Sequence, residues 1–199
     1  MTKTYDRAYF DRWYRNRSTR VNSAAEVRRK VSLAVASAEY FLHRPIRTVL
    51  DMGCGEGAWL PHLRALRPRV QYVGFDSSEY VVKRFGKSRN IHLATFGDLP
   101  KIEFGVFDLV ICSDVMHYIP EADLKRGARV LAEATDGVAY FEVLTKEDDV
   151  VGDLDSFIRR PAAFYRTLFT NLGMSPAGPY LWLSPAFEDA VAELEAPRT

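Results

Sequence analysis

A glycine-rich turn follows the first strongly apolar segment of the chain. The run DMGCGEG occupies residues 51–57, and glycines at this spacing let the backbone turn tightly and let a ligand approach it closely. With Ala58, the run also satisfies the GxGxxA pattern of dinucleotide-binding turns. The Asp51 carboxylate inside the turn would repel a pyrophosphate, and it suits a cationic ligand. An ordinary strand-to-helix turn is the alternative interpretation.

Two further carboxylates follow apolar segments. Asp76, with Ser77 beside it, comes about twenty residues after the turn, where a carboxylate can accept hydrogen bonds from both hydroxyls of a ribose. Capping a helix that begins near residue 78 is the alternative for Asp76. Asp98 is placed to accept from an adenine amino group, while the backbone N–H of Leu99 meets the ring. The alternative there is simple turn formation by Gly-Asp-x-Pro.

A third group of polar residues follows the apolar segment 107–112. It contains Ser113, Asp114 and His117. His117 is the best candidate for a general base, because histidine is the side chain whose charge ordinarily changes near neutral pH. A packing or hydrogen-bonding histidine is the alternative. Glu142, in the apolar segment 137–144, is a candidate for orienting a substrate.

Alternating strand and helix patterns position all of these residues. Apolar runs predict strands at 48–51, 70–75, 91–95, 107–113, 137–144 and 180–183, and periodic runs predict helices at 5–42, 58–66, 78–85, 121–134, 161–172 and 185–194. Strands that are apolar throughout and alternate with helices indicate a mostly parallel sheet covered on both faces. Ligands bind outside the carboxyl ends of such strands, where the candidate residues lie.

In this order and spacing, the blocks between residues 48 and 144 resemble the class I (Rossmann-like) S-adenosylmethionine-dependent methyltransferases, particularly the small-molecule group. The resemblance implies a doubly wound, single-domain α/β fold with about six to seven strands. It also implies roles for particular residues. The methionine moiety is contacted by Asp51, Gly53, Cys54, Gly55 and Gly57, and its side of the site is lined by Ser113. The ribose is contacted by Asp76 and Ser77, and the adenine by Asp98 and Leu99. The family sheet usually ends in an antiparallel hairpin, whereas segment 174–183 is proline-rich and short for two strands.

The N-terminal segment carries interleaved aromatic and basic residues. In compact enzymes of this family, the chain before the first strand often folds over the site and excludes water. Tyr9, Trp13 and Tyr14 are therefore candidates for a lid over the cofactor, with an anionic substrate met by one of Arg12, Arg15, Arg17 or Arg20. Aromatics packed on the sheet with arginines in solvent are the alternative, and RNA binding is a weaker one.

Composition bounds the remaining function classes. A chain of 199 residues suits one domain, divided into a helical cap at 1–45 and a core at 46–199. The net charge of +1 gives no argument for nucleic acid or a membrane surface. Two cysteines are too few for a disulfide framework, and no signal peptide or membrane-length apolar run is present. The chain is therefore expected in the cytoplasm, as a monomer or homodimer.

These observations predict methyl transfer from S-adenosylmethionine to an oxygen or nitrogen of a small molecule, with S-adenosylhomocysteine as product. The acceptor is expected to carry a carboxylate or phosphate or to be aromatic. A non-catalytic cofactor-binding subunit and an RNA or protein methyltransferase are the alternatives. No metal is predicted, because Asp114 lacks a convincing set of partners, and Cys112 lies inside a strand where a thiol is inert.

Overall fold

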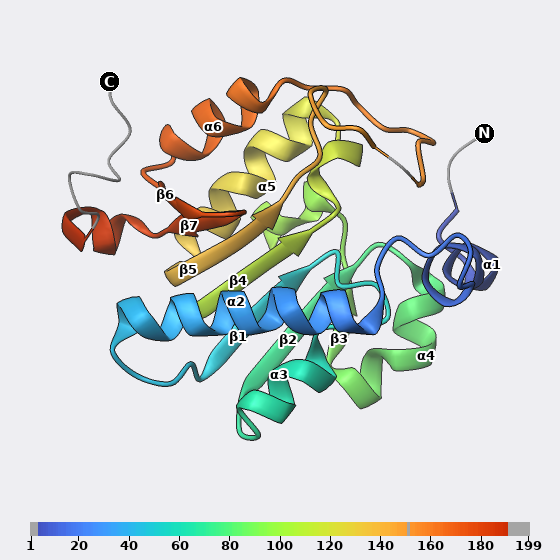
Figure 1. The fold of residues 1–199 in the computed structure, drawn as a ribbon, viewed down its shortest axis with the longest axis horizontal. Coiled ribbons are helices and arrows are strands. Elements are labelled where there is room, and N and C mark those ends of the chain that lie inside the picture. The colour runs from blue at the N-terminus through green and yellow to red at the C-terminus, as the bar shows by residue number, and fades with distance from the viewer. Residues whose placement is uncertain (1–3, 151, 191–199) are drawn as a thin grey trace.

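Seven strands form one twisted sheet at the centre of the molecule (Figure 1). The computed structural model describes residues 4–150 and 152–190. The strand order is β3-β2-β1-β4-β5-β7-β6. The strands are β1 (Thr48–Met52), β2 (Gln71–Asp76), β3 (Ile91–Leu93), β4 (Phe107–Ser113), β5 (Thr135–Glu142), β6 (Ser175–Gly178) and β7 (Leu181–Leu183).

The first five strands are parallel to one another, whereas β7 pairs antiparallel with both β5 and β6. β1 pairs with β2 on one side and with β4 on the other, so the strand order reverses at β1, where open α/β sheets bind ligands. The predicted α/β fold is confirmed. The final strand predicted at 180–183 is present as β7, and the unpredicted β6 precedes it, so this part of the chain forms an antiparallel hairpin. Pro176 is compatible with that pairing since β6 is an edge strand, where a missing backbone N–H is tolerated.

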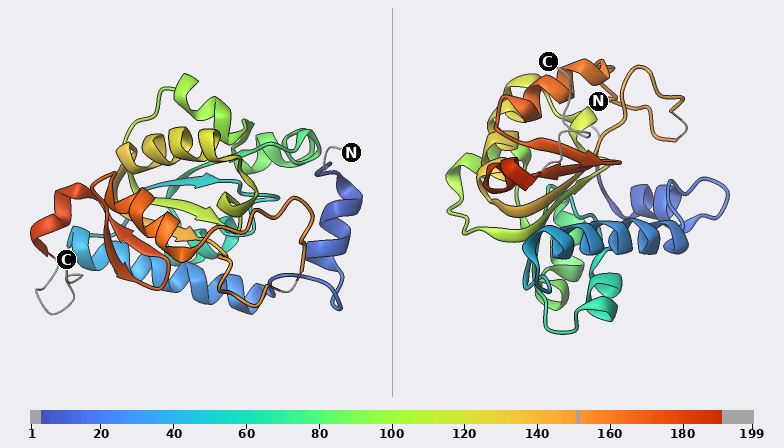
Figure 2. Two further views of the ribbon diagram at one scale, coloured as in Figure 1. Left: turned by 90° about the horizontal axis from the view of Figure 1, so that it is seen from above. Right: turned by 60° about the vertical axis from the view of Figure 1, so that its left-hand side comes forward.

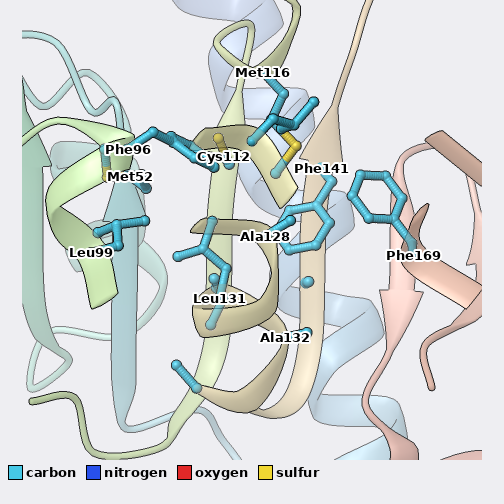
Figure 3. Close-up of a cluster of buried hydrophobic side chains, with 14 of the residues drawn as sticks. Met52, Phe96, Leu99, Cys112, Met116, Ala128, Leu131, Ala132, Phe141 and Phe169 are labelled. Carbon is cyan, nitrogen blue, oxygen red and sulfur yellow. The ribbon is translucent and has the colours of Figure 1, made fainter. Parts of the chain in front are cut away.

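Helices cover both faces of the sheet (Figure 2). They are α2 (Ala24–Leu42), α3 (Leu60–Leu66), α4 (Glu79–Arg89), α5 (Glu121–Glu133) and α6 (Ala162–Thr170). One core lies between the sheet and helices α5 and α6, where Leu131, Phe141 and Phe169 are buried together (Figure 3). A second core packs α2 and α3 against the opposite face. The two cores hold the strand ends in place.

The N-terminal helix is interrupted, so the predicted continuous helix over 5–42 is wrong. A short helix α1 (Arg7–Phe10) continues into a π-helical turn η1 (Asp11–Arg15). The chain is extended at Asn16 and becomes helical again at α2, where Ser23 and Glu26 form a capping box. A serine that accepts a backbone N–H at a helix start competes with helix continuation. The break allows α1 to leave the face of the sheet and lie near its carboxyl edge (Figure 1).

Short helical turns follow three of the strands and were not predicted as such. They are the 3₁₀ turns η2 (Phe96–Lys101), η3 (Met116–Tyr118) and η4 (Pro185–Ala190). The last replaces the first part of the helix predicted over 185–194, whose residues 191–194 lie outside the described residues. Among the residues that the structure describes, no helix is long and apolar enough to cross a membrane.

Candidate functional site

The glycine turn after β1 is held by the end of β2. The backbone N–H groups of Gly53 and Cys54 donate to the carbonyl oxygen of Phe75 at 2.7 and 3.1 Å. Gly53 has φ 73°, and a Cβ built on it would lie 2.4 Å from Cγ2 of Val115. Only glycine combines this left-handed conformation with such close packing. The turn therefore exposes backbone to a ligand at the carboxyl edge of the sheet.

Asp51 is a buried carboxylate beneath this turn. Its side chain accepts a hydrogen bond of 2.9 Å from the hydroxyl of Tyr72. Burial raises the pKa of Asp51 to about 7, the Tyr72 hydrogen bond opposes that rise, and repulsion from Asp76 adds to it. A buried carboxylate with this electrostatic cost is stabilised when a cation binds beside it. Burial likewise raises the pKa of the Cys54 thiol, which is therefore not a nucleophile.

Asp76 ends β2 and joins the turn to helix α4. Its two carboxylate oxygens accept from the backbone N–H groups of Gly55 and Ser78, each at 2.8 Å. The capping interpretation of Asp76 is thus partly realised, although the N-cap of α4 is Ser78 itself. Burial raises the pKa of Asp76, while these two N–H donors oppose the rise. The Asp76 carboxylate also lines a cavity of about 500 Å³ above the turn, so it remains available to a ligand.

Two cavities meet over the glycine turn. The larger has a volume of about 500 Å³ and the smaller of about 270 Å³. Both are lined by Phe10, Tyr14, Gly53, Gly55 and Asp114. Because they share these residues, the two cavities adjoin each other along the ends of β1, β2 and β4, and together they are called the cleft. A cleft of this size accommodates a nucleoside-type ligand and a small second molecule.

Most residues predicted for the site line this cleft. They are Tyr9, Tyr14, Asp51, Gly53, Cys54, Gly55, Asp76, Ser77 and Ser113. Gly57 is not among the lining residues: it has φ 74°, and its Cα faces Arg89 and Ile91. Gly57 therefore contributes to the conformation of the turn on the side away from the cleft.

Asp98 and Leu99 lie in η2 and do not line the cleft. The Asp98 carboxylate accepts from the backbone N–H and hydroxyl of Thr95 and pairs with Lys101. These contacts hold the pKa of Asp98 below its ordinary value. Leu99 is fully buried in the core. The residues of this segment that do line the cavity are Thr95 and Phe96, so the adenine role of Asp98 stays a prediction.

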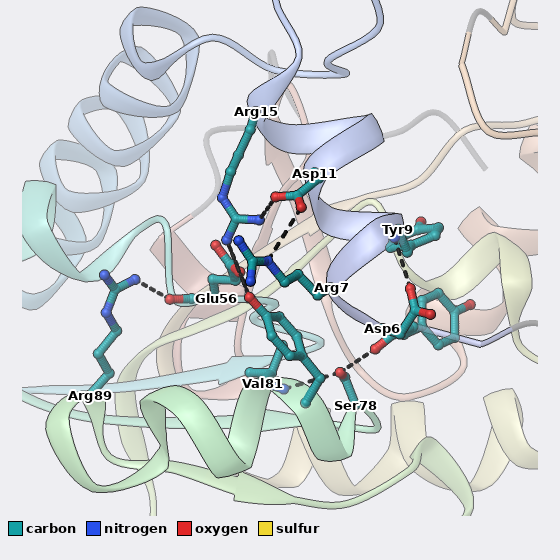
Figure 4. Close-up of polar contacts among 11 residues, drawn as sticks. Asp6, Arg7, Tyr9, Asp11, Arg15, Glu56, Ser78, Val81 and Arg89 are labelled. Carbon is teal, nitrogen blue, oxygen red and sulfur yellow. Dashed lines mark hydrogen bonds and ion pairs between the residues drawn. The ribbon is translucent and has the colours of Figure 1, made fainter.

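The N-terminal segment is held against the glycine turn and the start of α4 by polar contacts (Figure 4). Phe10 is buried against Cys54, Val81 and Ile91. The Ser78 hydroxyl donates to the carbonyl oxygen of Tyr5, which ties the start of the segment to α4. Further out, Glu56 receives Arg15 on its carboxylate and Arg89 on its carbonyl oxygen. The segment Tyr5–Arg15 is hereafter called the lid.

The arginines of the N-terminal segment do not reach the larger cavity. Arg15 pairs with Asp11 and Glu56, and Arg12 lies 4.7 Å over the ring of Trp13. Trp13 lines a separate outer cavity of about 600 Å³ with Arg12 and the 152–155 loop. Arg15 does line the smaller cavity, so the meeting of an anionic substrate with one of these arginines stays a prediction.

Glu142 closes the end of β5 beside the smaller cavity. It accepts from the hydroxyl of Ser113 and forms an ion pair with Lys30, whose Nζ also donates to Asn22 at 2.8 Å. Glu142 itself does not line either part of the cleft. It holds Ser113 in position, and its predicted contact with substrate is untested.

His117 is completely buried and does not line the cleft. Its Nδ1 accepts the backbone N–H of Leu144 at 3.3 Å, and its ring packs on Tyr118 and Phe157. A base must reach the proton that it removes. The position of His117 therefore favours the alternative interpretation, a packing and hydrogen-bonding residue.

Comparison with known proteins identifies the family. Residues 16–185 match the model of a methyltransferase domain family. The chain belongs to this family. The resemblance predicted from the sequence blocks is thus confirmed.

Relatives and solved structures agree with this assignment. A malonyl-[acyl-carrier protein] O-methyltransferase from Legionella pneumophila is 33% identical over 100 residues, which is 47% of this chain and 35% of that protein. The sugar N-methyltransferase KedS8 from Streptoalloteichus has a TM-score of 0.63 at 18% identity, with 92% of this chain and 94% of that one covered. Magnesium protoporphyrin IX methyltransferase from Synechocystis, solved with bound SAM, has a TM-score of 0.60 at 19% identity, with 90% and 93% covered. The chain thus spans about a third of the length of that Legionella protein.

Sequence reasoning missed several residues of the cleft. Tyr5, Phe10, Val115 and Tyr118 line it, and Asp114 lines both of its parts. The aromatic periodicity of the first fifteen residues was a usable signal for Tyr5 and Phe10. For Asp114, the signal was its place directly after β4, where a strand of the predicted sheet delivers its residues to the ligand edge.

Proposed function

We propose that this chain transfers a methyl group from S-adenosylmethionine to an oxygen or nitrogen of a small molecule, leaving S-adenosylhomocysteine. The observation that carries the proposal is the pairing of buried Asp51 with Asp76 around a backbone-exposing turn. A dinucleotide would place its pyrophosphate against this turn, where Asp51 would repel it. A cofactor with an ammonium group and a ribose, but no phosphate, matches the two carboxylates.

Each side of the cleft has a distinct task in this reaction. S-adenosylmethionine supplies an electrophilic methyl group on a sulfonium sulfur. Asp51 and Ser113 face the amino acid end of the cofactor, Asp76 the ribose hydroxyls, and Phe96 the base. The lid excludes water and holds the acceptor in line with the methyl group, and such alignment alone provides large rate accelerations. This arrangement requires no nucleophile on the protein.

The size of the cleft supports a small acceptor. Its smaller part has about 270 Å³ and its larger part about 500 Å³. KedS8 acts on a sugar and the Synechocystis protein on a porphyrin, which fits a metabolite acceptor here as well. Cys54 and Cys112 are free and buried, in keeping with a reducing cytoplasm. A monomer or homodimer remains the expected assembly.

Calorimetry with S-adenosylhomocysteine and with NADH tests the cofactor. We expect binding of the former and not of the latter. Asp76→Asn should weaken S-adenosylhomocysteine binding roughly 10- to 150-fold, because a hydrogen bond to a charged group contributes about 1.5–3 kcal/mol. Asp136→Asn, an exposed carboxylate at the opposite end of β5, is the matched control and should bind normally. No binding of S-adenosylhomocysteine at millimolar concentration would refute the proposal. A screen of metabolites for methyl transfer then identifies the acceptor.

A further inference from the structure

Asp114 occupies the junction of the two parts of the cleft. It directly follows β4, and its backbone N–H donates to the carbonyl oxygen of Glu142 at 3.0 Å. Its φ is 63°, a left-handed conformation that a residue other than glycine adopts only at a cost. Such conformations persist at ligand sites where the surroundings enforce them. The strained backbone directs Asp114 into the cleft beside Gly53, where the cofactor's sulfur end is expected.

His117 stands directly behind this carboxylate. Because Nδ1 accepts the N–H of Leu144, the neutral ring carries its proton on Nε2. That nitrogen lies 3.3 Å from Oδ1 of Asp114 and makes no well-aligned hydrogen bond within the described part of the chain. The aromatic rings of Tyr118 and Phe157 hold the imidazole in place. The buried Nε2 of His117 therefore lies next to the Asp114 carboxylate and limits the positions that this carboxylate can take.

The larger part of the cleft has a negative and aromatic lining. Within the described residues, no arginine or lysine lines it. Its carboxylates are Asp76, assigned above to the ribose, and Asp114, which is left for the acceptor, and its phenol rings are those of Tyr5, Tyr9, Tyr14 and Tyr118. Burial, followed by the charges of Asp153, Asp76 and Asp155, raises the pKa of Tyr5 to about 12. Carboxylates and the faces of aromatic rings both attract cations.

The outer cavity next to the lid continues this pattern. It shares Tyr9 with the cleft, and the described residues that line it include three carboxylates and one arginine. Those residues are Asp6, Asp153, Asp155 and Arg12. Acidic side chains therefore outnumber basic ones among the described residues that line the approach to the cleft.

We propose that the acceptor is an amine and that Asp114, held by His117, binds its nitrogen next to the transferred methyl group. The inference rests on the function proposed above and adds the class of substrate to it. A protonated amine first releases one proton to solvent, which frees its lone pair. The nitrogen lone pair then forms the new N–C bond while the C–S bond breaks and sulfur keeps the electron pair. The positive charge thus moves from sulfur to nitrogen, and the methylated ammonium then releases one proton to solvent. A carboxylate next to that nitrogen stabilises the arriving charge.

An anionic acceptor would reverse this electrostatic argument. Methyl transfer neutralises a carboxylate and removes one negative charge from a phosphate. Asp114 would therefore repel the bound anionic acceptor before the reaction and would not stabilise the methylated product. Asp114 is therefore assigned as a catalytic residue that contacts the substrate, and His117 as a positioning residue that acts through it.

The analogue sinefungin tests the inference by binding alone. In sinefungin, a carbon carrying an amino group replaces the methylated sulfur, so an ammonium stands where the methyl group is transferred. We expect the unmodified protein to bind sinefungin more tightly than neutral S-adenosylhomocysteine in calorimetry. Asp114→Asn, which retains shape and tolerates positive φ, should weaken sinefungin at least tenfold. Its affinity for S-adenosylhomocysteine should change less than about threefold, and Asp136→Asn should alter neither.

The outcomes separate the two proposals. Absence of S-adenosylhomocysteine binding contradicts the methyltransferase function itself. Normal S-adenosylhomocysteine binding, with sinefungin equal or weaker in the unmodified protein, overturns the role of Asp114 even if the variant does not fold. An equal loss of both ligands in a folded Asp114→Asn protein would also overturn it. In the metabolite screen, efficient methylation of a carboxylate or phosphate would contradict the amine assignment.

Discussion

The two sides of the cleft are constructed in different ways. The cofactor side is a turn between consecutive elements, and its backbone is fixed by hydrogen bonds to β2, as at Gly53 and Cys54. The acceptor side is assembled from the lid, the segment after β4 and the 152–156 loop, which are far apart in sequence. Its parts meet mainly through side chains. The first side should therefore be rigid without a ligand, and the second should depend on the docking of the lid.

The largest effect is expected from a methyl group added to the rigid side. Gly53→Ala places Cβ against Val115 and forces alanine into φ 73°. Left-handed strain of about 1–2 kcal/mol and the steric overlap together should reduce affinity for S-adenosylhomocysteine roughly a hundredfold. Calorimetry measures the loss. Gly105→Ala, which meets no atom within 4 Å, should bind normally.

A second substitution separates the two causes of that loss. Val115→Ala, combined with Gly53→Ala, removes the steric overlap and leaves the backbone strain, so we expect partial recovery of affinity. Normal binding by Gly53→Ala alone would show that the turn is not rigid, and the contrast between the two sides would fail.

A smaller effect is expected from loosening the acceptor side. Phe10→Ala removes a ring that is 3% exposed and packs on Cys54 and Val81. Truncation of a buried phenylalanine costs about 3–5 kcal/mol. Here this loss should reduce the free energy that holds the lid against the rest of the protein. We expect faster hydrogen exchange over residues 5–15 and about tenfold weaker S-adenosylhomocysteine binding.

The melting temperature should distinguish lid opening from general unfolding. It should change little in Phe10→Ala, since Phe10 belongs to neither core of the sheet. Tyr40→Ala, an aromatic residue of α2 that is 72% exposed, is the control for both measurements. A large fall in melting temperature without local exchange would mean that the lid and the sheet unfold as one unit.

The same contrast explains what the sequence could predict. Local sequence patterns predicted the five parallel strands, the turn at 51–57 and Asp76. Each strand is an apolar run, and the residues that directly follow the run lie at the carboxyl edge of the sheet. The break at Asn16 depends on a capping side chain at the start of α2, and the β6–β7 hairpin depends on the edge position of β6. Both leave a weaker pattern in the sequence than an apolar run does. The docking of the lid could not be predicted, since it joins Tyr5 to Ser78 and Arg15 to Glu56 across long stretches of chain.

His117 and Asp114 illustrate the limit within one segment. Both follow β4, so the sequence places them at the ligand edge. Residue type alone favoured His117 as the reactive group. Burial decides otherwise, because the imidazole is fully enclosed while the neighbouring carboxylate lines the cleft. Burial of a polar side chain depends on packing by distant segments, here the ring of Phe157.

The pH dependence of cofactor binding sharpens the description of the rigid side. Burial raises the pKa of Asp51 to about 7, whereas an unfolded aspartate ionises near pH 4. The ligand-free protein should therefore lose stability as the pH rises from about 4 to 7, because the folded state holds the proton that the unfolded chain has released. An ammonium ligand favours the ionised carboxylate, so affinity should rise with pH.

Between pH 6 and 8, affinity for S-adenosylhomocysteine should increase by up to about tenfold, as Asp51 passes from mostly protonated to mostly ionised. Calorimetry at several pH values measures the slope. Asp51→Asn removes the titration and should give a nearly flat profile, with Asp136→Asn retaining the slope. An unchanged slope in Asp51→Asn would assign the titration to another group and leave Asp51 without contact to the ammonium.

The smallest effect concerns the connection between His117 and Asp114. His117→Gln and His117→Leu both remove the acceptor for the N–H of Leu144, but only glutamine offers a donor near the former Nε2. Nε2 of His117 lies near Asp114 without an aligned hydrogen bond, so its contribution stays below that of such a bond, about 1 kcal/mol. The preference for sinefungin over S-adenosylhomocysteine should therefore fall by at most about fivefold in the leucine variant relative to the glutamine variant. A purely structural histidine would lower the melting temperature and weaken both ligands alike, leaving that preference unchanged. The ratio of the two affinities therefore distinguishes a positioning residue from a packing residue, even though both variants are destabilised.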